Sequence, residues 1–164
     1  QMLTEALSEV DMPPSAVRLE ITESVVMDEI GPTIAALDSI RSLGISLAVD
    51  DFGTGYSSLS YLARLPIQGL KIDQRFVQGI ERNRNDETIT QAIIALAHSL
   101  GLRCIAEGVE SRAQIDFLRR HGCEEAQGFL ICPPLEEAEL RAWWEARARE
   151  RPAVAQPELW PSVP

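Results

Sequence analysis

The chain has 164 residues, 45% hydrophobic and 24% charged, which is enough apolar sequence to fold around one core. Its 25 acidic and 15 basic residues give a net charge of −10, which argues against a protein that holds a nucleic-acid polymer on a basic surface. No apolar run approaches the roughly 20 residues that span a bilayer, and no signal segment is visible, so we expect no membrane segment in this chain. We therefore expect a cytoplasmic protein, or the cytoplasmic part of a membrane-anchored one.

Helical and strand patterns alternate along the chain. Apolar residues at helical spacing predict a first helix that ends before Pro13-Pro14, and further helices over 29–43, 57–65, 88–100, 112–121 and 135–148. Short apolar runs between them predict strands over 17–22, 45–49, 69–73, 102–106 and 125–127. This alternation is typical of a parallel sheet with right-handed crossovers, so the predicted fold class is α/β. Residues 149–164 carry four prolines and are predicted to be a flexible tail.

Every predicted strand ends in charged or amide side chains. In chain order these are Glu20 and Glu23, Asp50 and Asp51, Lys71 and Asp73, Glu107, and Gln127. The ends of parallel strands lie along one edge of the sheet, where a (β/α) barrel builds its active site. A doubly wound sheet also binds ligands at this edge, but it more often carries a glycine-rich phosphate turn, and the chain has no GxGxxG sequence.

The acidic residues of this edge predict a metal site. Five carboxylates in one pocket repel one another unless cations lie among them, and Lys71 alone is not enough. Carboxylate and amide oxygens without nearby His or Cys favour a hard cation, Mg²⁺ or Mn²⁺. The adjacent Asp50 and Asp51 suit two ions about 3.5 to 4 Å apart, the arrangement of phosphodiester hydrolysis, with Lys71 orienting or activating a water.

Five segments of the chain resemble a known family. They are Glu20-Ile21-Thr22-Glu23-Ser24, the segment DDFGTGYSSL over 50–59, Lys71-Ile72-Asp73, Ala106-Glu107-Gly108-Val109-Glu110, and Gln127-Gly128-Phe129. In order and spacing they resemble the signature segments of EAL-domain cyclic di-GMP phosphodiesterases, over about residues 1–148. The resemblance implies a TIM-barrel-like (β/α)8 fold and the hydrolysis of cyclic di-GMP to linear pGpG in bacterial second-messenger signalling.

The resemblance also implies metal-binding and catalytic roles. Glu20 is similar to a ligand of the first metal, Asp50 to the bridge between two metals, and Asp51 and Glu107 to ligands of the second. Lys71 resembles the lysine that holds the hydrolytic water. Glu107 is also similar to the general base where a single metal is assumed.

Other matched residues are implied to support this site. Glu23 resembles the glutamate that steadies the loop over 50–59, which covers the site in the family and lies near a dimer interface. Gln127 and Asp73 resemble supporting contacts. The lid part of the loop is predicted to comprise Phe52, Gly53, Thr54 and Gly55.

The chain also departs from the family pattern. The Glu-Ala-Leu motif and an asparagine on the next strand, which precede the Glu20 segment in the family, are missing. Glu5-Ala6-Leu7 spells the motif only by coincidence, in a predicted helix. Five strands do not close an eight-stranded barrel, so we expect an incomplete barrel, the C-terminal portion of an EAL domain over 1–148, inactive as this fragment alone. Ile131-Cys132-Pro133 replaces a segment that usually carries a basic residue, whose loss would weaken a phosphate or guanine contact.

Three functions stay open on the sequence. The first is a metal-dependent cyclic di-GMP phosphodiesterase, a homodimer when complete, with an upstream sensory or GGDEF-type domain. The second is a noncatalytic EAL-like module that binds cyclic di-GMP or a protein partner, which the missing motif favours. The third is an unrelated α/β metal hydrolase. An intact Glu-Ala-Leu motif and asparagine upstream would favour the enzyme.

Overall fold

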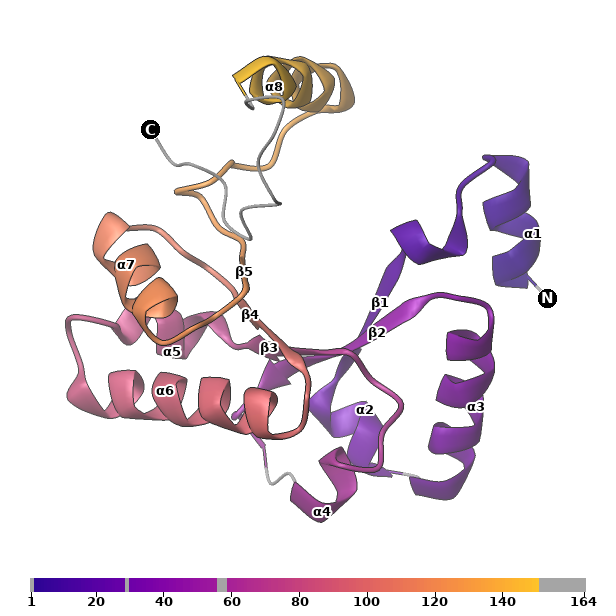
Figure 1. The fold of residues 1–164 in the computed structure, drawn as a ribbon, viewed down its shortest axis with the longest axis horizontal. Helices are drawn as coiled ribbons and strands as arrows, with labels where there is room; N and C mark the ends of the chain where they lie inside the picture. The colour runs from indigo at the N-terminus through magenta and orange to yellow at the C-terminus, as the bar shows by residue number, and fades with distance from the viewer. Residues whose placement is uncertain (1, 29, 56–58, 151–164) are drawn as a thin grey trace.

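The structure is a computed structural model that describes residues 2–28, 30–55 and 59–150, in which helices and strands alternate (Figure 1). The strands are β1 (Arg18–Thr22), β2 (Ser46–Phe52), β3 (Gly69–Ile72), β4 (Arg103–Ala106) and β5 (Glu125–Ala126). The helices are α1 (Met2–Glu9), α2 (Glu23–Asp28), α3 (Ile30–Ser42), α4 (Leu59–Leu62), α5 (Gln74–Gly79), α6 (Arg84–Ser99), α7 (Arg112–Arg120) and α8 (Glu137–Glu150), with a 3-10 helix over Pro14–Ala16.

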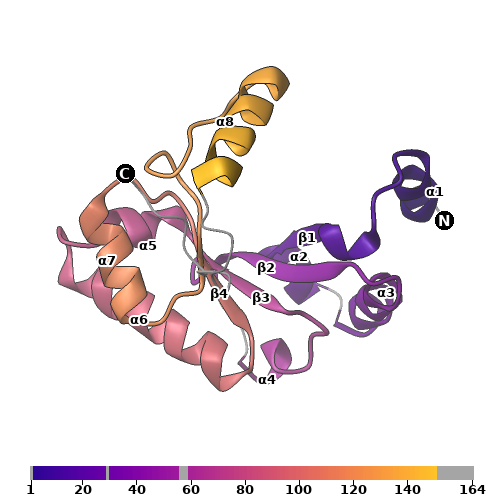
Figure 2. The same ribbon diagram turned by 45° about the horizontal axis from the view of Figure 1, so that its top comes forward.

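The five strands form one parallel sheet in the order β1-β2-β3-β4-β5, which confirms the predicted α/β class. Each strand therefore pairs with the next one along the chain, and helices cover the connections. Figure 2 shows β2, β3 and β4 crossing the middle of the molecule, with α5, α6 and α7 on one side and α3 on the other. Within the described ranges, β1 and β5 form the two edges of the sheet.

Alternate residues of each strand face the inner or the outer side of the sheet. We call the side that carries Glu20, Asp50 and Lys71 the inner face, and the side that packs under the helices the outer face. The strand register assigns further residues to the inner face: Arg18, Ser46, Ala48, Gly69, Arg103, Ile105 and Glu125. Most functional candidates therefore share one face with small or apolar residues in the middle of the sheet.

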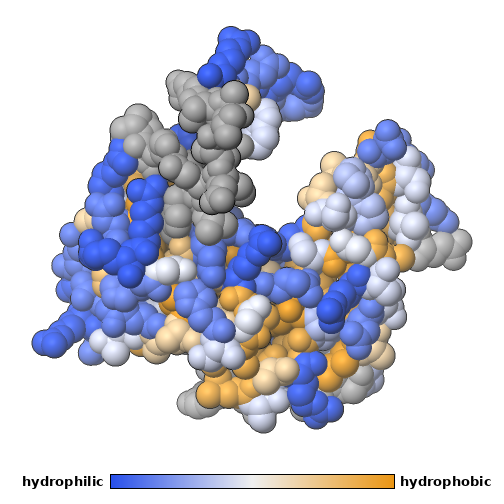
Figure 3. All heavy atoms as spheres, in the orientation of Figure 1, coloured by the Kyte–Doolittle hydropathy of each residue, from blue (hydrophilic) through white to orange (hydrophobic). Residues whose placement is uncertain are grey.

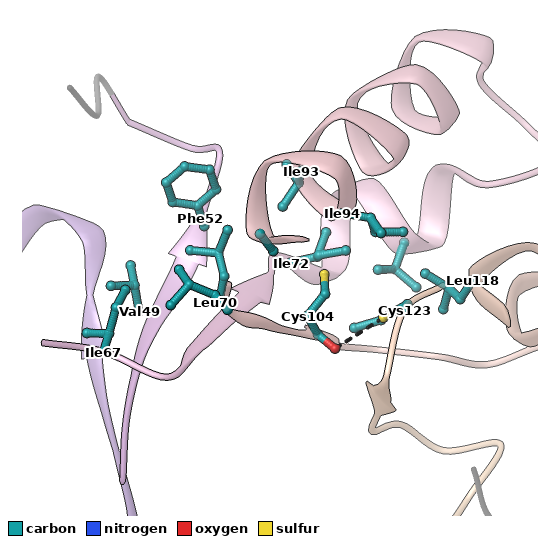
Figure 4. Close-up of a cluster of buried hydrophobic side chains, with 14 of the residues drawn as sticks. Val49, Phe52, Ile67, Leu70, Ile72, Ile93, Ile94, Cys104, Leu118 and Cys123 are labelled. Carbon is teal, nitrogen blue, oxygen red and sulfur yellow. Dashed lines mark hydrogen bonds between the residues drawn. The ribbon is translucent and has the colours of Figure 1, made fainter. Parts of the chain in front are cut away.

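The outer face forms the hydrophobic core. Figure 4 shows side chains of β3 and β4 packed against α6 and α7, with Leu70, Ile72, Cys104, Ile94 and Leu118 among them. Burial of these apolar side chains is the main source of the free energy that keeps the sheet folded. Cys123 is also buried here, and its thiol donates a hydrogen bond of 3.4 Å to the backbone oxygen of Cys104.

The helices differ from the prediction where capping residues decide their ends. The short helices α2 and α5 are absent from the sequence-based prediction because six residues are too few to show a helical apolar repeat. Asp73 caps α5 by accepting a hydrogen bond of 2.8 Å from the Arg75 backbone N–H. Asn83 caps α6 through the Asn85 N–H, so this helix begins at Arg84 and not at 88.

A β-bulge in β2 contains the two adjacent aspartates, Asp50 and Asp51. Val49 pairs with Leu70 and Phe52 with Ile72, so β2 holds one residue more than β3 between these pairs. Asp51 lies within the bulge and has a left-handed φ of 55°. The bulge returns Phe52 to the outer face, where only 5% of its surface is exposed. Phe52 is therefore a core residue of β2, and not part of the loop as predicted.

The carboxyl-terminal part of the described chain stands apart from the sheet. Figures 1 and 2 both place α8 away from α5, α6 and α7. This helix runs to Glu150, two residues into the predicted tail, and the tail from 151 to 164 lies outside the described residues. None of the helices that the structure describes is long and apolar enough to cross a membrane.

Candidate functional site

The inner face gathers four charged side chains at the carboxyl ends of the strands. Glu20 comes from β1, Asp50 from β2, Lys71 from β3, and Glu107 follows β4. Carboxylate oxygens of Glu20, Asp50 and Glu107 all lie within 4.8 Å of one another. We call these four residues the carboxyl-end cluster. The sequence predicts that polar side chains at the ends of separate strands lie close together, and these four residues do.

Lys71 lies at the centre of the carboxyl-end cluster. Its ammonium Nζ lies 2.5 Å from Glu20 Oε2, 2.5 Å from Glu107 Oε1 and 3.0 Å from Asp50 Oδ1. Only 3% of the Lys71 side chain is exposed, whereas Glu20 is 40% exposed. A lysine has three N–H donors, so these three carboxylates engage all of them. Burial alone would lower the pKa of Lys71, but these contacts outweigh it and raise the pKa above its ordinary value.

The carboxyl-end cluster carries more negative charge than its lysine neutralises. Three carboxylates surround one ammonium, which leaves an excess of two negative charges on the four residues. Burial raises the pKa of Glu107, and the negative charges of Asp50 and Glu20 act in the same direction, although Lys71 opposes them. A divalent cation would balance this excess, and three carboxylates in a half-buried position are the oxygen ligands that Mg²⁺ and Mn²⁺ prefer. The residues present therefore fit a hard divalent ion.

Two other predicted site residues lie beside this cluster and not within it. The side chain of Asp51, which follows Asp50 in the bulge, interacts with Asp73. Asp73 is buried and forms an ion pair with Arg75, whose Nε lies 3.0 Å from Asp73 Oδ1. Burial would raise the pKa of Asp73, but Arg75 lowers it overall. The structure thus does not bring Asp51 to the carboxylates of Glu20, Asp50 and Glu107, and its role as a ligand stays a prediction.

Two supporting residues contact the parts of the site for which they were predicted. Gln127 donates a hydrogen bond of 2.8 Å from Nε2 to Glu107 Oε1. Glu23 is buried, and its Oε2 accepts hydrogen bonds from the backbone N–H of Gly53 at 3.1 Å and of Gly55 at 3.2 Å. A Cβ atom at Gly55 would lie 2.9 Å from Glu23 Oε1, so a side chain here would displace the carboxylate that accepts these two hydrogen bonds. Glu23 therefore holds the start of the predicted lid loop against α2.

The loop residues beyond Gly55 fall partly outside the described chain. Thr54 donates from its hydroxyl to the backbone oxygen of Asp51 at 3.0 Å, which closes the turn after the bulge. Residues 56–58 lie outside the described residues, and so does the predicted helix start at 57; the described part of α4 runs from Leu59 to Leu62. The described part of the lid loop thus comprises Gly53, Thr54 and Gly55.

A second charged group on the inner face was not predicted from the sequence. Arg18 at the start of β1 and Glu125 at the start of β5 form a two-fold ion pair, with Nη1–Oε2 and Nη2–Oε1 distances of 2.7 and 3.0 Å. Arg103 of β4 also reaches Glu125 Oε1, at 3.4 Å. We call these three residues the amino-end cluster. In the sequence, the one indication of this cluster is that its residues lie at strand starts. Arg18 lies two residues before Glu20, and Glu125 lies two residues before Gln127.

Comparison with known families agrees with this geometry. The family described as "EAL domain" matches residues 1–134 of the chain. The cyclic di-GMP phosphodiesterase NbdA of Pseudomonas aeruginosa is 46% identical over 141 residues, which are 86% of this chain and 18% of NbdA. The bifunctional diguanylate cyclase/cyclic di-GMP phosphodiesterase MucR of the same organism is 43% identical over 137 residues, 84% of this chain and 20% of MucR. The chain spans about a fifth of the length of these relatives.

Solved structures show the same fold. The PaMucR phosphodiesterase in complex with c-di-GMP superposes with a TM-score of 0.80 at 42% identity, over 84% of this chain and 56% of that one. Klebsiella pneumoniae BlrP1 in complex with manganese and cy-diGMP gives a TM-score of 0.71 at 32% identity, over 78% of this chain and 33% of BlrP1. BlrP1 was also solved with calcium and cy-diGMP. The five-stranded sheet thus corresponds to part of a TIM-barrel-like fold.

Proposed function

Because the chain belongs to the EAL domain family, we propose that it supplies the metal-binding and catalytic residues of a cyclic di-GMP phosphodiesterase, which releases linear pGpG. The carboxyl-end cluster is the observation that carries this proposal. It joins residues from four strands at the end of the sheet where barrel enzymes place their chemistry, and it holds an uncompensated negative charge. Two relatives carry this activity in their names, and two of the structural neighbours hold the nucleotide.

The metal would be held by Glu20, Asp50 and Glu107. We propose Mg²⁺ or Mn²⁺, with two ions in the complete domain and Asp51 as a further ligand of the second. A bound divalent ion supplies Lewis-acid polarisation of a phosphate oxygen. The structures of BlrP1 with manganese and with calcium, both in complex with cy-diGMP, support a role for a divalent ion in the family.

Lys71, Glu107 and Gln127 supply the other roles in the proposed hydrolysis. Lys71 is charged, so it cannot be a metal ligand, and it holds the attacking water and stabilises negative charge that develops on the phosphate. It can donate to that water only when one of its three carboxylates turns away, because all three of its N–H groups are engaged. Glu107 would accept the proton of the water where a single ion is bound, and the Gln127 amide keeps that carboxylate in place.

We also propose that residues 1–148 are the C-terminal portion of the domain and that this chain turns over little nucleotide by itself. The support is the sheet, in which β1 and β5 leave open edges among the described residues. Circular dichroism and a hydrolysis assay on the 164-residue chain test this proposal, and rapid release of pGpG by the chain alone would contradict it.

We propose a homodimer for the complete domain, and Figure 3 supports it, because hydrophobic residues gather over α2 and α4, with Val25 and Leu59 exposed.

The direct test of this function is a hydrolysis assay on the intact protein. We expect pGpG to form with Mg²⁺ or Mn²⁺ and to stop when a chelator removes the ion. Asp50→Asn should abolish turnover, since a neutral amide binds a cation poorly. Asp38→Asn, an equal change at an exposed position of α3, should leave it unchanged. Binding of cyclic di-GMP without hydrolysis would instead support the noncatalytic module.

A further inference from the structure

We propose that the Arg18–Glu125 ion pair positions the edge-strand residues of the carboxyl-end cluster. The inference rests on the proposed function, since it concerns the same metal and catalytic residues. Within the described part of the chain, Arg18 and Glu125 form no hydrogen bond or ion pair with those residues, although the charges of Arg18 and Glu20 attract each other. They belong to no segment that carries the family resemblance. They act through the strands on which they lie.

The ion pair joins the two outermost strands of the sheet across its inner face. β1 and β5 are separated by β2, β3 and β4. In a flat sheet the two edges would lie about 19 Å apart, at about 4.8 Å for each strand pair, which an arginine and a glutamate side chain cannot span together. Both contacts of the Arg18 guanidinium to the Glu125 carboxylate are nevertheless short, at 2.7 and 3.0 Å. The sheet is therefore curved enough to bring β1 and β5 toward each other, and this pair links the two strands across the inner face.

The same curvature assembles the carboxyl-end cluster. In a flat sheet β1 and β4 would lie about 14 Å apart, yet carboxylate oxygens of Glu20 and Glu107 lie within 4.8 Å. Glu20 is the contribution of β1, and the amide of Gln127, just after β5, reaches Glu107. Arg18 precedes Glu20 by two residues on the same face of β1, and Glu125 precedes Gln127 by two residues, about 7 Å along each strand.

Among the residues that the structure describes, the middle of the inner face offers no polar link that could do this instead. Between the two clusters lie Ala48, Gly69 and Ile105, and a Cβ atom at Gly69 would lie 3.2 Å from both of its neighbours. These residues are buried and pack closely without hydrogen-bonding side chains. The spacing of β1 and β5 at the carboxyl end is thus set from the amino end by Arg18 and Glu125.

Arg103 offers a matched control for the pair. It is also an arginine on the inner face, and it contacts the same Glu125 carboxylate, at 3.4 Å. It lies on β4, which is paired directly to β5, so its contact spans no gap in the sheet. Its removal changes the charge near Glu125 but leaves the edges of the sheet joined.

The test measures Mn²⁺ affinity by calorimetry and kcat and KM by hydrolysis on the intact protein. Arg18→Gln and Glu125→Gln should each weaken Mn²⁺ binding by roughly tenfold, as is typical when a residue that orients a ligand is lost. The double variant should be no weaker than either single one, because both changes break the same contact. Arg18→Lys should recover part of the affinity, and Arg103→Gln should change it less than twofold.

Two comparisons separate this inference from its alternatives. Ile94→Val in the outer core should lower the unfolding temperature without changing Mn²⁺ affinity; if it weakens Mn²⁺ binding as much as Arg18→Gln, the pair acts only through general stability and the inference is wrong. If Asp50→Asn abolishes Mn²⁺ binding while Arg18→Gln leaves it unchanged, the inference fails and the proposed function stands. If Asp50→Asn itself leaves Mn²⁺ binding unchanged, the proposed function fails as well.

Discussion

The two charged clusters of the inner face differ in how their charges balance. At the amino end, two guanidinium groups meet the single carboxylate of Glu125, so every charged oxygen has a partner. At the carboxyl end, three carboxylates meet the single ammonium of Lys71. The same sheet thus carries one cluster whose negative charge is fully paired and one whose negative charge is in excess.

The pKa values of the two glutamates express this difference. The hydrogen bonds from Arg18 lower the pKa of Glu125, whereas burial raises the pKa of Glu107 with help from the neighbouring carboxylates. A structural ion pair lowers the free energy of the folded chain as it stands, while a cluster with excess charge is stable only when something positive joins it. The charge count therefore distinguishes the cluster built for a ligand from the one built for the fold.

Lys71→Ala should give the largest effect on turnover. Lys71 stabilises charge that develops in the transition state, so its loss should lower kcat by roughly 10² or more while the affinity for cyclic di-GMP stays within a few-fold. Steady-state kinetics together with a binding titration measure the two effects separately. If Lys71→Ala loses nucleotide binding but keeps full turnover at saturation, Lys71 is a phosphate contact. The carboxyl-end cluster would then differ from the amino-end cluster in binding and not in catalysis.

Replacing Mg²⁺ or Mn²⁺ by another divalent ion should give the second-largest effect on turnover, and this change concerns the carboxyl-end cluster alone. Calcium is larger and polarises water less than Mg²⁺, so we expect cyclic di-GMP to bind in calcium while hydrolysis falls roughly tenfold or more. The assay compares turnover in Mg²⁺, Mn²⁺ and Ca²⁺ at equal nucleotide saturation. Equal rates in all three would argue that the excess negative charge has no catalytic use.

A smaller effect should follow pH at the amino-end cluster. The folded-state pKa of Glu125 lies below its unfolded value, so the ion pair stabilises the fold above about pH 4.5, the unfolded value, and this contribution is lost as pH falls through the folded pKa. The free energy of unfolding of Arg18→Gln should lie about 1 kcal/mol below that of the parent at pH 7. Urea unfolding of both proteins from pH 7 to pH 3 should show this gap closing, and a constant gap would contradict the ion-pair account.

The sequence predicted the carboxyl-end cluster well because its residues follow a simple rule. Asp50, Lys71 and Glu107 lie near or just after the end of a strand, Glu20 lies in the middle of β1, and the carboxyl ends of parallel strands share one edge of the sheet. The alternation of strands and helices predicted the fold class on the same grounds. These features depend on local patterns that the chain displays directly.

What the sequence did not predict depends on backbone detail and on long-range geometry. The bulge at Asp51 adds one residue to β2, so Asp50 and Asp51 both lie opposite Lys71 in the strand register and Phe52 returns to the outer face. The pattern DDF alone does not reveal this shift. The Arg18–Glu125 pair joins residues 107 positions apart and exists only because the sheet is curved. No local sequence pattern predicts a contact of this kind.

A calorimetric titration of Mn²⁺ into the intact protein tests the central claim most directly. The account requires the excess negative charge of Glu20, Asp50 and Glu107 to bind the ion. We expect saturable Mn²⁺ binding to the parent protein and to Asp38→Asn, and its loss in Asp50→Asn with the fold intact by circular dichroism. Equal Mn²⁺ affinity in all three proteins would contradict the assignment of the carboxyl-end cluster as a metal site.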